Sequence, residues 1–106
     1  MDDRCVSPLA YDNRPIGVFD SGLGGLTVAR SIATSLSHES IYYVGDTKRC
    51  PYGPRSENEV RTFALQAGRW LEAHDVKIIV IACNTATAAA LTVAQQTLDV
   101  PVIGVI

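Results

Sequence analysis

A predicted strand over residues 77–82, apolar from Ile78 onward, leads directly into Cys83, and this segment constrains the fold more than any other. Its succession of isoleucine and valine is typical of a strand that is buried on both faces of a sheet. The alanine-rich residues 85–98 that follow predict a helix, with Asn84 or Thr85 as its N-cap. Cys83 is therefore expected at the carboxyl end of a central strand and at the start of a helix.

This position would suit a reactive thiol. A helix N-terminus carries partial positive charge, which favours the thiolate form of a cysteine. The alternative is that Cys83 is a small core residue, because unpaired cysteines are among the most buried residue types. The segment by itself leaves both interpretations open.

A second strand–turn–helix unit lies near the N-terminus. Residues 15–19 predict a short buried strand, and residues 26–36 have apolar side chains at helical spacing. The glycine-rich turn between them begins with Asp20 and Ser21. It lacks the third glycine of a dinucleotide-binding turn and the Gly-Lys-Ser/Thr of a P-loop. The turn could aim N–H groups at an anion, or Asp20 and Ser21 could simply cap the helix.

A third unit connects these two. Residues 40–44 predict a strand, and Gly45, Asp46 and Thr47 leave its carboxyl end. After a loop with two prolines, Ser56 and Glu59 have the spacing of a capping box. The helix that follows has an apolar face on which we expect Trp70 to be a core residue, and His74 to be exposed at its end.

Alternating strands and helices predict an α/β fold: a parallel sheet with flanking helices in three layers, of the Rossmann or flavodoxin-like kind. Residues 102–106 begin its fourth strand. In such a sheet the carboxyl ends of the strands share one edge, where ligands bind. The polar residues that leave three of these strands are thus expected to form one small-molecule site.

Composition excludes several other classes. The 106 residues suffice for one domain, and the net charge of −2 without a basic cluster argues against nucleic acid as a partner. Three cysteines without short spacing and two scattered histidines predict neither a disulfide framework nor a metal site. The apolar runs are too short for a membrane span and no signal peptide is recognisable, so we expect a cytoplasmic protein.

Three ordered segments resemble the amino-terminal half of the glutamate racemases, within the aspartate/glutamate racemase superfamily. They are residues 15–28, which contain Asp-Ser-Gly-Leu-Gly-Gly, residues 45–56, which contain Pro-Tyr-Gly, and residues 82–86, Ala-Cys-Asn-Thr-Ala. The resemblance extends over residues 15–106 with the spacing between the motifs intact.

The resemblance implies interconversion of L- and D-glutamate without a cofactor, which provides D-glutamate for peptidoglycan. Two cysteines, one from each of two similar domains, would flank the substrate Cα, and Cys83 matches the first. The remaining matches are Asp20, as a catalytic and substrate-binding residue, Asp46 in a supporting role, and the substrate-binding residues Ser21, Tyr52, Gly53, Asn84 and Thr85.

Two departures from the family pattern shape the expectations. Cys50 occupies a variable position of the loop and, like Cys5, is interpreted as an incidental thiol. The sequence stops at Ile106, within a predicted strand. We therefore expect a flexible leader over residues 1–14 and an amino-terminal racemase domain over 15–106, without the second domain.

Such a chain would carry one catalytic cysteine and be inactive alone, although a homodimer across the open edge is conceivable. The alternative is an inactive truncated domain that binds glutamate or a partner. A single-thiol hydrolase based on Cys83 is disfavoured, because neither His38 nor His74 is expected near the thiol.

Overall fold

Four parallel strands form a single sheet in the computed structural model, which describes residues 12–22 and 24–105. The elements alternate along the chain as β1 (Ile16–Asp20), α1 (Leu26–Ser35), β2 (Ile41–Gly45), α2 (Glu57–Ala73), β3 (Ile78–Ile81), α3 (Asn84–Thr97) and β4 (Val102–Gly104). The order across the sheet is β2-β1-β3-β4. The predicted α/β fold is confirmed.

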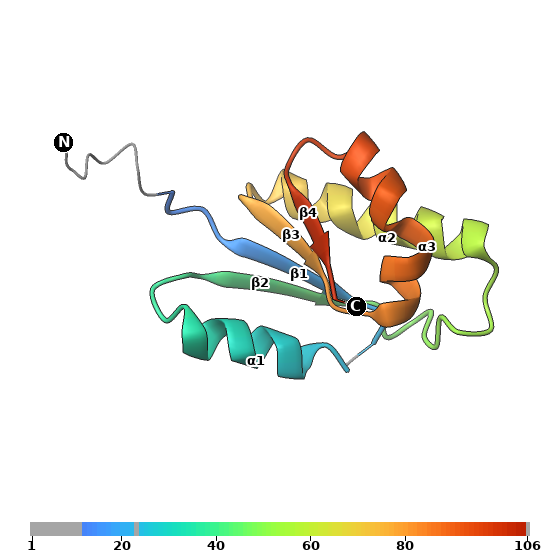
Figure 1. Ribbon diagram of the computed structural model, residues 1–106, viewed down its shortest axis with the longest axis horizontal. Coiled ribbons are helices and arrows are strands. Elements are labelled where there is room, and N and C mark those ends of the chain that lie inside the picture. Colours follow the sequence, from blue (N-terminus) through green and yellow to red (C-terminus); the bar gives the residue numbers. More distant parts are fainter. Residues whose placement is uncertain (1–11, 23, 106) are drawn as a thin grey trace.

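The helices cover the sheet on both faces, which gives the three predicted layers. Helix α1 lies on one face, whereas α2 and α3 lie on the other (Figure 1). The connection from β1 to β2 and the connection from β2 to β3 therefore pass on opposite faces of the sheet. Strand β1 pairs with both β2 and β3, so β2 is added on one side of β1 and β3 on the other. The strand order therefore reverses between β1 and β3.

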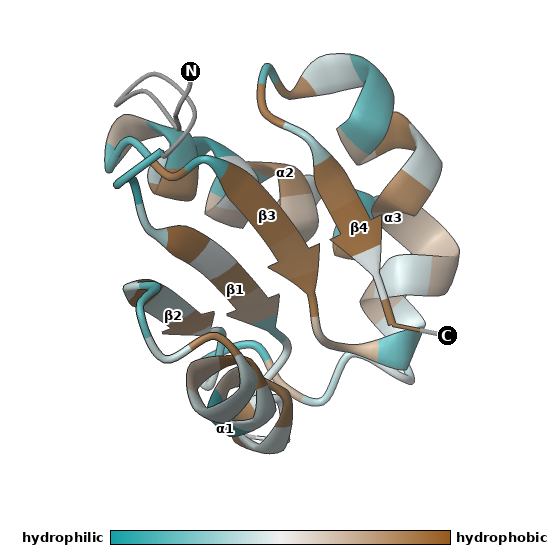
Figure 2. Cartoon of the chain, turned by 60° about the vertical axis from the view of Figure 1, so that its left-hand side comes forward, coloured by the Kyte–Doolittle hydropathy of each residue, from teal (hydrophilic) through white to brown (hydrophobic). Residues whose placement is uncertain are grey.

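The two faces of the central strands are both buried, as the continuous apolar pattern predicted. In β1 and β3, Phe19, Ile79 and Ile81 belong to the core beneath α2 and α3, whereas Val18 and Val80 belong to the core beneath α1. Strand β3 is accordingly hydrophobic along its length (Figure 2). This two-sided burial fixes the register, because a shift by one residue would exchange the two faces.

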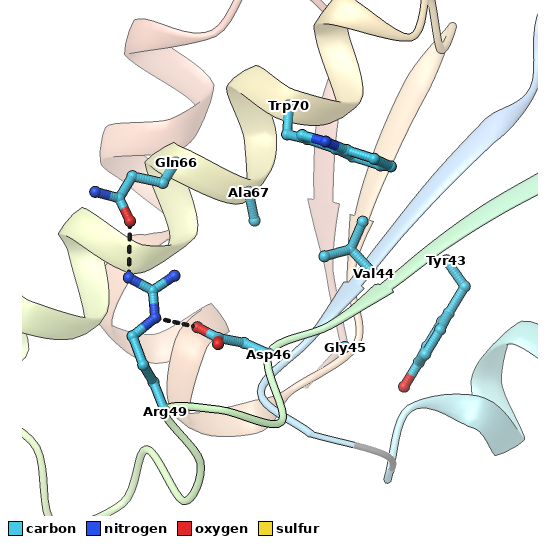
Figure 3. Close-up of a pocket in the computed structure, with 8 residues that line it drawn as sticks. All are labelled: Tyr43, Val44, Gly45, Asp46, Arg49, Gln66, Ala67 and Trp70. Atoms are coloured by element: carbon cyan, nitrogen blue, oxygen red, sulfur yellow. Dashed lines mark hydrogen bonds and ion pairs between the residues drawn. The ribbon is translucent and has the colours of Figure 1, made fainter.

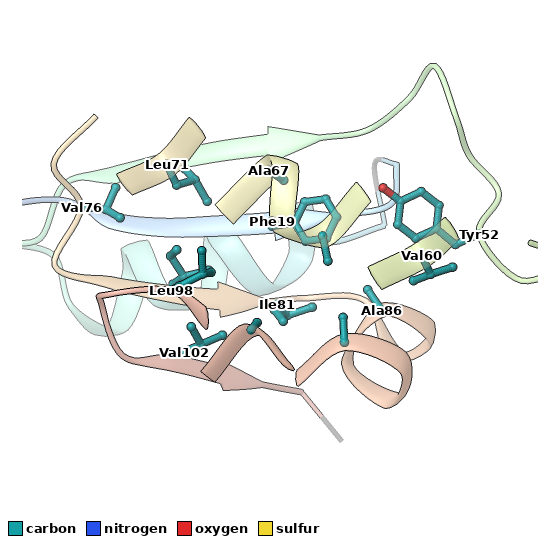
Figure 4. Close-up of a cluster of buried hydrophobic side chains, with 14 residues drawn as sticks. Phe19, Tyr52, Val60, Ala67, Leu71, Val76, Ile81, Ala86, Leu98 and Val102 are labelled. Atoms are coloured by element: carbon teal, nitrogen blue, oxygen red, sulfur yellow. The ribbon is translucent and has the colours of Figure 1, made fainter. Parts of the chain in front are cut away.

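The larger core lies between the sheet and the pair α2 and α3 (Figure 4). Gly68 of α2 faces Leu98, so closely that a Cβ there would lie 2.5 Å from Leu98 Cδ1. A larger residue at position 68 would push the two segments apart. Helix α2 begins with the predicted capping box. The Ser56 side chain accepts a hydrogen bond from the backbone N–H of Glu59, and the Glu59 side chain accepts one from the backbone N–H of Ser56.

The expectation that Trp70 is a core residue was wrong. Its side chain is 48% exposed, whereas the neighbouring Leu71 is completely buried. The buried stripe of α2 is made by the smaller residues Val60, Ala64, Ala67, Gly68 and Leu71. Trp70 projects beside this stripe, next to the edge strand β2, where there is less sheet to cover it.

The predicted leader is only partly described, and Cys5 lies outside the described residues. The carbonyl of Asp12 accepts a 2.7 Å hydrogen bond from Lys77 Nζ, and Arg14 pairs with the Asp12 carboxylate. None of the described helices is both long and apolar enough to cross a membrane.

Candidate functional site at the carboxyl ends of the strands

Asp20 ends β1 and is almost completely buried, with 4% of its surface exposed. Its Oδ2 accepts hydrogen bonds from the N–H groups of Gly25 at 2.7 Å and Gly22 at 3.3 Å. Oδ1 has no hydrogen-bond donor among the described residues. The carboxylate thus organises the glycine-rich turn through one oxygen and keeps the other available for a ligand or a proton.

The turn is packed tightly against its neighbours. A Cβ on Gly25 would lie 2.7 Å from Asp20 Cβ and 3.0 Å from Ala82 Cβ, and one on Gly45 would lie 2.2 Å from the Gly22 carbonyl oxygen. These glycines are needed because other chain segments approach them. No described glycine has a positive φ.

Tyr43 of β2 reaches across to this turn, a contact that the sequence analysis missed. Its hydroxyl donates to the Gly22 carbonyl at 3.0 Å and lies 3.4 Å from Asp20 Oδ2. Burial, followed by the charge of Asp20, raises the pKa of Tyr43 to about 12. The phenol therefore remains a neutral donor that holds the turn in place.

Cys83 follows β3 and is itself the N-cap of α3, so the expectation of Asn84 or Thr85 as the cap was wrong. Cys83 Sγ accepts a hydrogen bond from the N–H of Ala86 at 3.4 Å. Sequence rules favour oxygen-bearing caps and give little weight to a thiol in this position. The contact places the sulfur where the positive end of the helix dipole stabilises negative charge. Asn84 and Thr85 form the exposed first turn.

Asp20 and Cys83 lie on neighbouring strands. The N–H of Ala82 donates to the Phe19 carbonyl at 2.7 Å, so β1 and β3 remain paired up to the residues that precede the site. Both residues lie at the carboxyl ends of β1 and β3, where the strand order reverses. Ligands of open α/β sheets bind at such a point.

The loop after β2 is fixed by a polar network. Asp46 N–H donates to the Asp20 carbonyl at 2.9 Å, and Asp46 Oδ2 accepts from Tyr52 Oη at 2.5 Å and from Arg49 Nε at 2.8 Å. The Arg49 guanidinium stacks on the Phe63 ring, 3.9 Å from its centroid. Asp46 therefore links the loop to the end of β1.

The Tyr52 ring lies in the core, and its hydroxyl reaches Asp46 at the end of β2. Its side chain is 1% exposed and packs near the rings of Phe19 and Phe63. Burial and the hydrogen bond to Asp46 raise the pKa of Tyr52 well above its usual value. Gly53 is exposed, and it lines a cavity of about 370 Å³ together with Thr85 and Val60.

Cys50 is exposed, as expected for a loop residue, but it lies closer to the site than the sequence indicated. Its Sγ donates to the Thr47 carbonyl at 3.1 Å, and a Cβ on Gly22 would contact it at 3.6–3.8 Å. Among the described residues, no three His, Cys, Asp or Glu side chains are grouped so that they could hold a metal ion.

The structure therefore brings Asp20, Ser21, Asp46 and Cys83 to one edge, and joins Gly53 to Thr85 across a cavity. Sequence reasoning missed Tyr43 and Arg49. Tyr43 occupies an ordinary strand position and Arg49 an ordinary loop position, so no local pattern distinguishes them.

Comparison with known proteins identifies racemases as the relatives of this chain. Residues 16–106 match the family model described as Asp/Glu/Hydantoin racemase. Over 94 residues, the chain is 60% identical to a glutamate racemase of Lysinibacillus sphaericus and 63% identical to one of Exiguobacterium sibiricum. These matches cover 89% of this chain but only 36% and 35% of the relatives, so the chain spans little more than a third of their length.

Solved structures of glutamate racemases also superpose on this chain. The glutamate racemase isoform RacE1 of Bacillus anthracis superposes with a TM-score of 0.84 at 51% identity, over 89% of this chain and 35% of that one. A glutamate racemase of Francisella tularensis, determined in complex with D-glutamate, gives 0.83 at 46% identity, over 89% and 36%.

Proposed function

Because this chain belongs to the Asp/Glu/hydantoin racemase family, we propose that it provides one side of the active site of a glutamate racemase. The reaction is the interconversion of L- and D-glutamate, which would provide D-glutamate for peptidoglycan. The observation that carries the proposal is the placement of Asp20 and Cys83 at the ends of the paired strands β1 and β3.

Cys83 is the base in this proposal. Its thiolate takes the α-proton of glutamate, which breaks the Cα–H bond, forms an S–H bond and leaves the electron pair on the substrate. A thiol on the opposite face then gives its proton to Cα and becomes a thiolate. The Sγ contact with the N–H of Ala86 supports this role, because fixed donors stabilise the charge on sulfur before the proton is transferred.

The acid for the opposite face comes from outside residues 12–22 and 24–105. The other described thiol, Cys50, is on the loop that follows β2 and donates to a backbone carbonyl of that loop. Inversion requires proton delivery from the face opposite the base, and Cys83 serves only one face. The 1–106 chain alone is therefore expected to be inactive.

Asp20 has a catalytic role as proton acceptor and orienting group. Gly25 and Gly22 direct their N–H groups at Oδ2, so a proton on Asp20 is held at Oδ1. A buried carboxylate with one oxygen fixed and the other available can hold a proton near the thiol or accept from the substrate ammonium group.

The charged ends of glutamate are bound by polar groups around these two residues. Ser21 is half-buried and the side chains of Asn84 and Thr85 are exposed on the first turn of α3, where N–H groups favour anions. The loop contributes through the backbone of Tyr52 and Gly53, since the Tyr52 ring is buried. Asp46 supports this loop through its hydrogen bond with Tyr52.

The test is glutamate racemisation in deuterated water by the protein form that contains both sides of the site. L-Glutamate should yield D-glutamate with deuterium at Cα, because the proton that is added comes from a solvent-exchanged thiol. Formation of D-glutamate with full retention of the original α-hydrogen would contradict the two-thiol mechanism. Absence of both D-glutamate and exchange, in a folded protein, would contradict the proposed activity.

A further inference from the structure

A second cavity lies beside the edge strand β2, and Cys83 is not among the residues that line it. It has a volume of about 490 Å³ and is lined by eight residues: Tyr43, Val44, Gly45, Asp46, Arg49, Gln66, Ala67 and Trp70. This volume is in the range of small-molecule sites, which are typically apolar with a few polar groups that fix orientation.

The apolar part of the cavity is aromatic. The Trp70 ring lies over Val44, with Ala67 beside it (Figure 3). His74 packs against the indole with ring centroids 3.9 Å apart, which restricts the ring. An exposed tryptophan that is held in this way offers a surface on which a planar ring can stack.

Two of the polar residues that line the cavity, Arg49 and Asp46, each have one atom without a described hydrogen-bond partner. Arg49 uses Nε for Asp46 and Nη1 for Gln66, both at 2.8 Å, and Nη2 has no hydrogen-bond partner among the described residues. Asp46 Oδ2 is occupied by Arg49 and Tyr52, whereas Oδ1 has no described donor. The stacking of Arg49 on Phe63 fixes the plane of the guanidinium.

We propose that this cavity binds a small planar aromatic carboxamide. The ring stacks on Trp70, the amide carbonyl accepts from Arg49 Nη2, and the amide N–H donates to Asp46 Oδ1. A carboxylate in place of the amide fits less well, because Asp46 would repel it and already neutralises Arg49. A cavity with one donor beside one acceptor selects a neutral group that has both.

The cavity shares Asp46, and through it the loop after β2, with the edge that holds Asp20 and Cys83. Asp46 holds Tyr52 and, through its N–H, the end of β1. A ligand that contacts Asp46 therefore also affects the position of the loop segment that contains Gly53. The binding itself does not depend on the proposed racemase activity, and it can be measured without glutamate.

The test is titration of the ¹⁵N-labelled chain with benzamide, followed by amide and indole N–H shifts. Shifts should appear at Val44, Gly45, Asp46, Ala67 and Trp70, with a Kd near 1 mM, as expected for so few ligand atoms. Cyclohexanecarboxamide and benzoate should each bind at least about fivefold more weakly, because one lacks the ring and the other the N–H.

Two variants separate the contacts. Arg49→Lys should weaken benzamide binding about tenfold, since an ammonium lacks the planar fork. The matched control Arg69→Lys, at an exposed position of α2 outside the cavity, should leave Kd unchanged. Trp70→Leu, at a half-exposed position that does not endanger the core, should abolish the preference for benzamide over cyclohexanecarboxamide.

Three results would overturn the proposal. They are the absence of shifts at about 10 mM benzamide, far above the expected Kd, shifts confined to other regions such as Thr85 and Ala88, and equal binding of benzamide and benzoate. Loss of racemase activity in any protein form would leave these measurements unaffected.

Discussion

The hydroxyl of Tyr52, whose ring belongs to the core beneath α2, donates a 2.5 Å hydrogen bond to Oδ2 of the half-buried Asp46. This contact adds a structural role to both residues. The tyrosine that the family motif suggests as a substrate contact has a buried ring, and the aspartate expected in a supporting role holds the loop. It also makes the position of Gly53 dependent on a contact that involves no substrate.

Replacing Tyr52 by phenylalanine should therefore lower stability more than substrate affinity. A buried hydrogen bond to a charged group contributes roughly 1.5–3 kcal/mol, so the melting temperature should fall by several degrees. KM for glutamate should change little. The control is Tyr42→Phe, because Tyr42 is 41% exposed. A raised KM with unchanged melting would show that the Tyr52 hydroxyl contacts the substrate.

Cys83→Ala should abolish racemisation and leave the fold intact. Alanine cannot take the α-proton, and the loss of one weak cap contact should cost no more than about 1 kcal/mol. The measurement is D-glutamate formation in the racemase-active form, with circular dichroism to check folding. The matched control Cys50→Ala should retain activity within about twofold. Comparable losses in both variants would mean that the base was assigned to the wrong thiol.

Asp20→Asn should lower kcat by about 10²-fold and change KM much less. The amide oxygen can still accept from Gly25, so the turn is preserved, but the NH₂ group cannot accept a proton at the position of Oδ1. Steady-state kinetics against pH provide the readout. An effect confined to KM would make Asp20 a binding residue only.

Gly45 at the end of β2 and Gly53 in the loop that follows should respond differently to replacement by alanine. In Gly45→Ala the new Cβ would lie 2.2 Å from the Gly22 carbonyl oxygen, whereas the Cβ in Gly53→Ala meets nothing within 4 Å. We expect about 1–3 kcal/mol of destabilisation for the first and little change for the second, measured by urea unfolding. Equal stability of the two variants would contradict the packing of β2 against the turn.

Alkaline pH should weaken the fold partly through Tyr43. Its pKa is raised from 10.0 to about 12 in the folded chain, so between these values the unfolded state releases a proton that the folded state retains. Stability is then complete below pH 10 and falls as the pH rises towards 12. The loss over this interval should be smaller in Tyr43→Phe, as measured by unfolding at fixed pH. An identical loss in both proteins would contradict the raised pKa.

The fold could be predicted because burial on both faces leaves a signature in each central strand. Isoleucine and valine occupy successive positions in β3, and the helices are separated by glycine, proline and cap residues. Each element lies within about two residues of its expected bounds. The exposure of Trp70 could not be predicted in this way, because helical spacing does not show which helix residues lie beyond the edge of the sheet.

The arrangement of the site could be predicted only in part from the sequence. Asp20 and Cys83 could be expected at one edge because parallel strands align their carboxyl ends. The direction of Tyr52, the reach of Tyr43 to Gly22 and the position of Cys50 depend on contacts between distant segments. No local pattern encodes them, and the thiol cap at Cys83 departs from ordinary cap preferences.

The pairing of β1 with β3 also determines when the site can exist. Ile16 pairs with Ile78, and this contact closes a long loop that contains α1, β2 and α2, at an entropic cost. A partly folded chain with only β1, α1 and β2 assembled would already hold the Asp20 carboxylate in its turn, but without a thiol beside it. Because this contact joins segments far apart in the sequence, we expect the reactive pair to assemble late in folding, so that chemical competence reports on the pairing of β1 with β3.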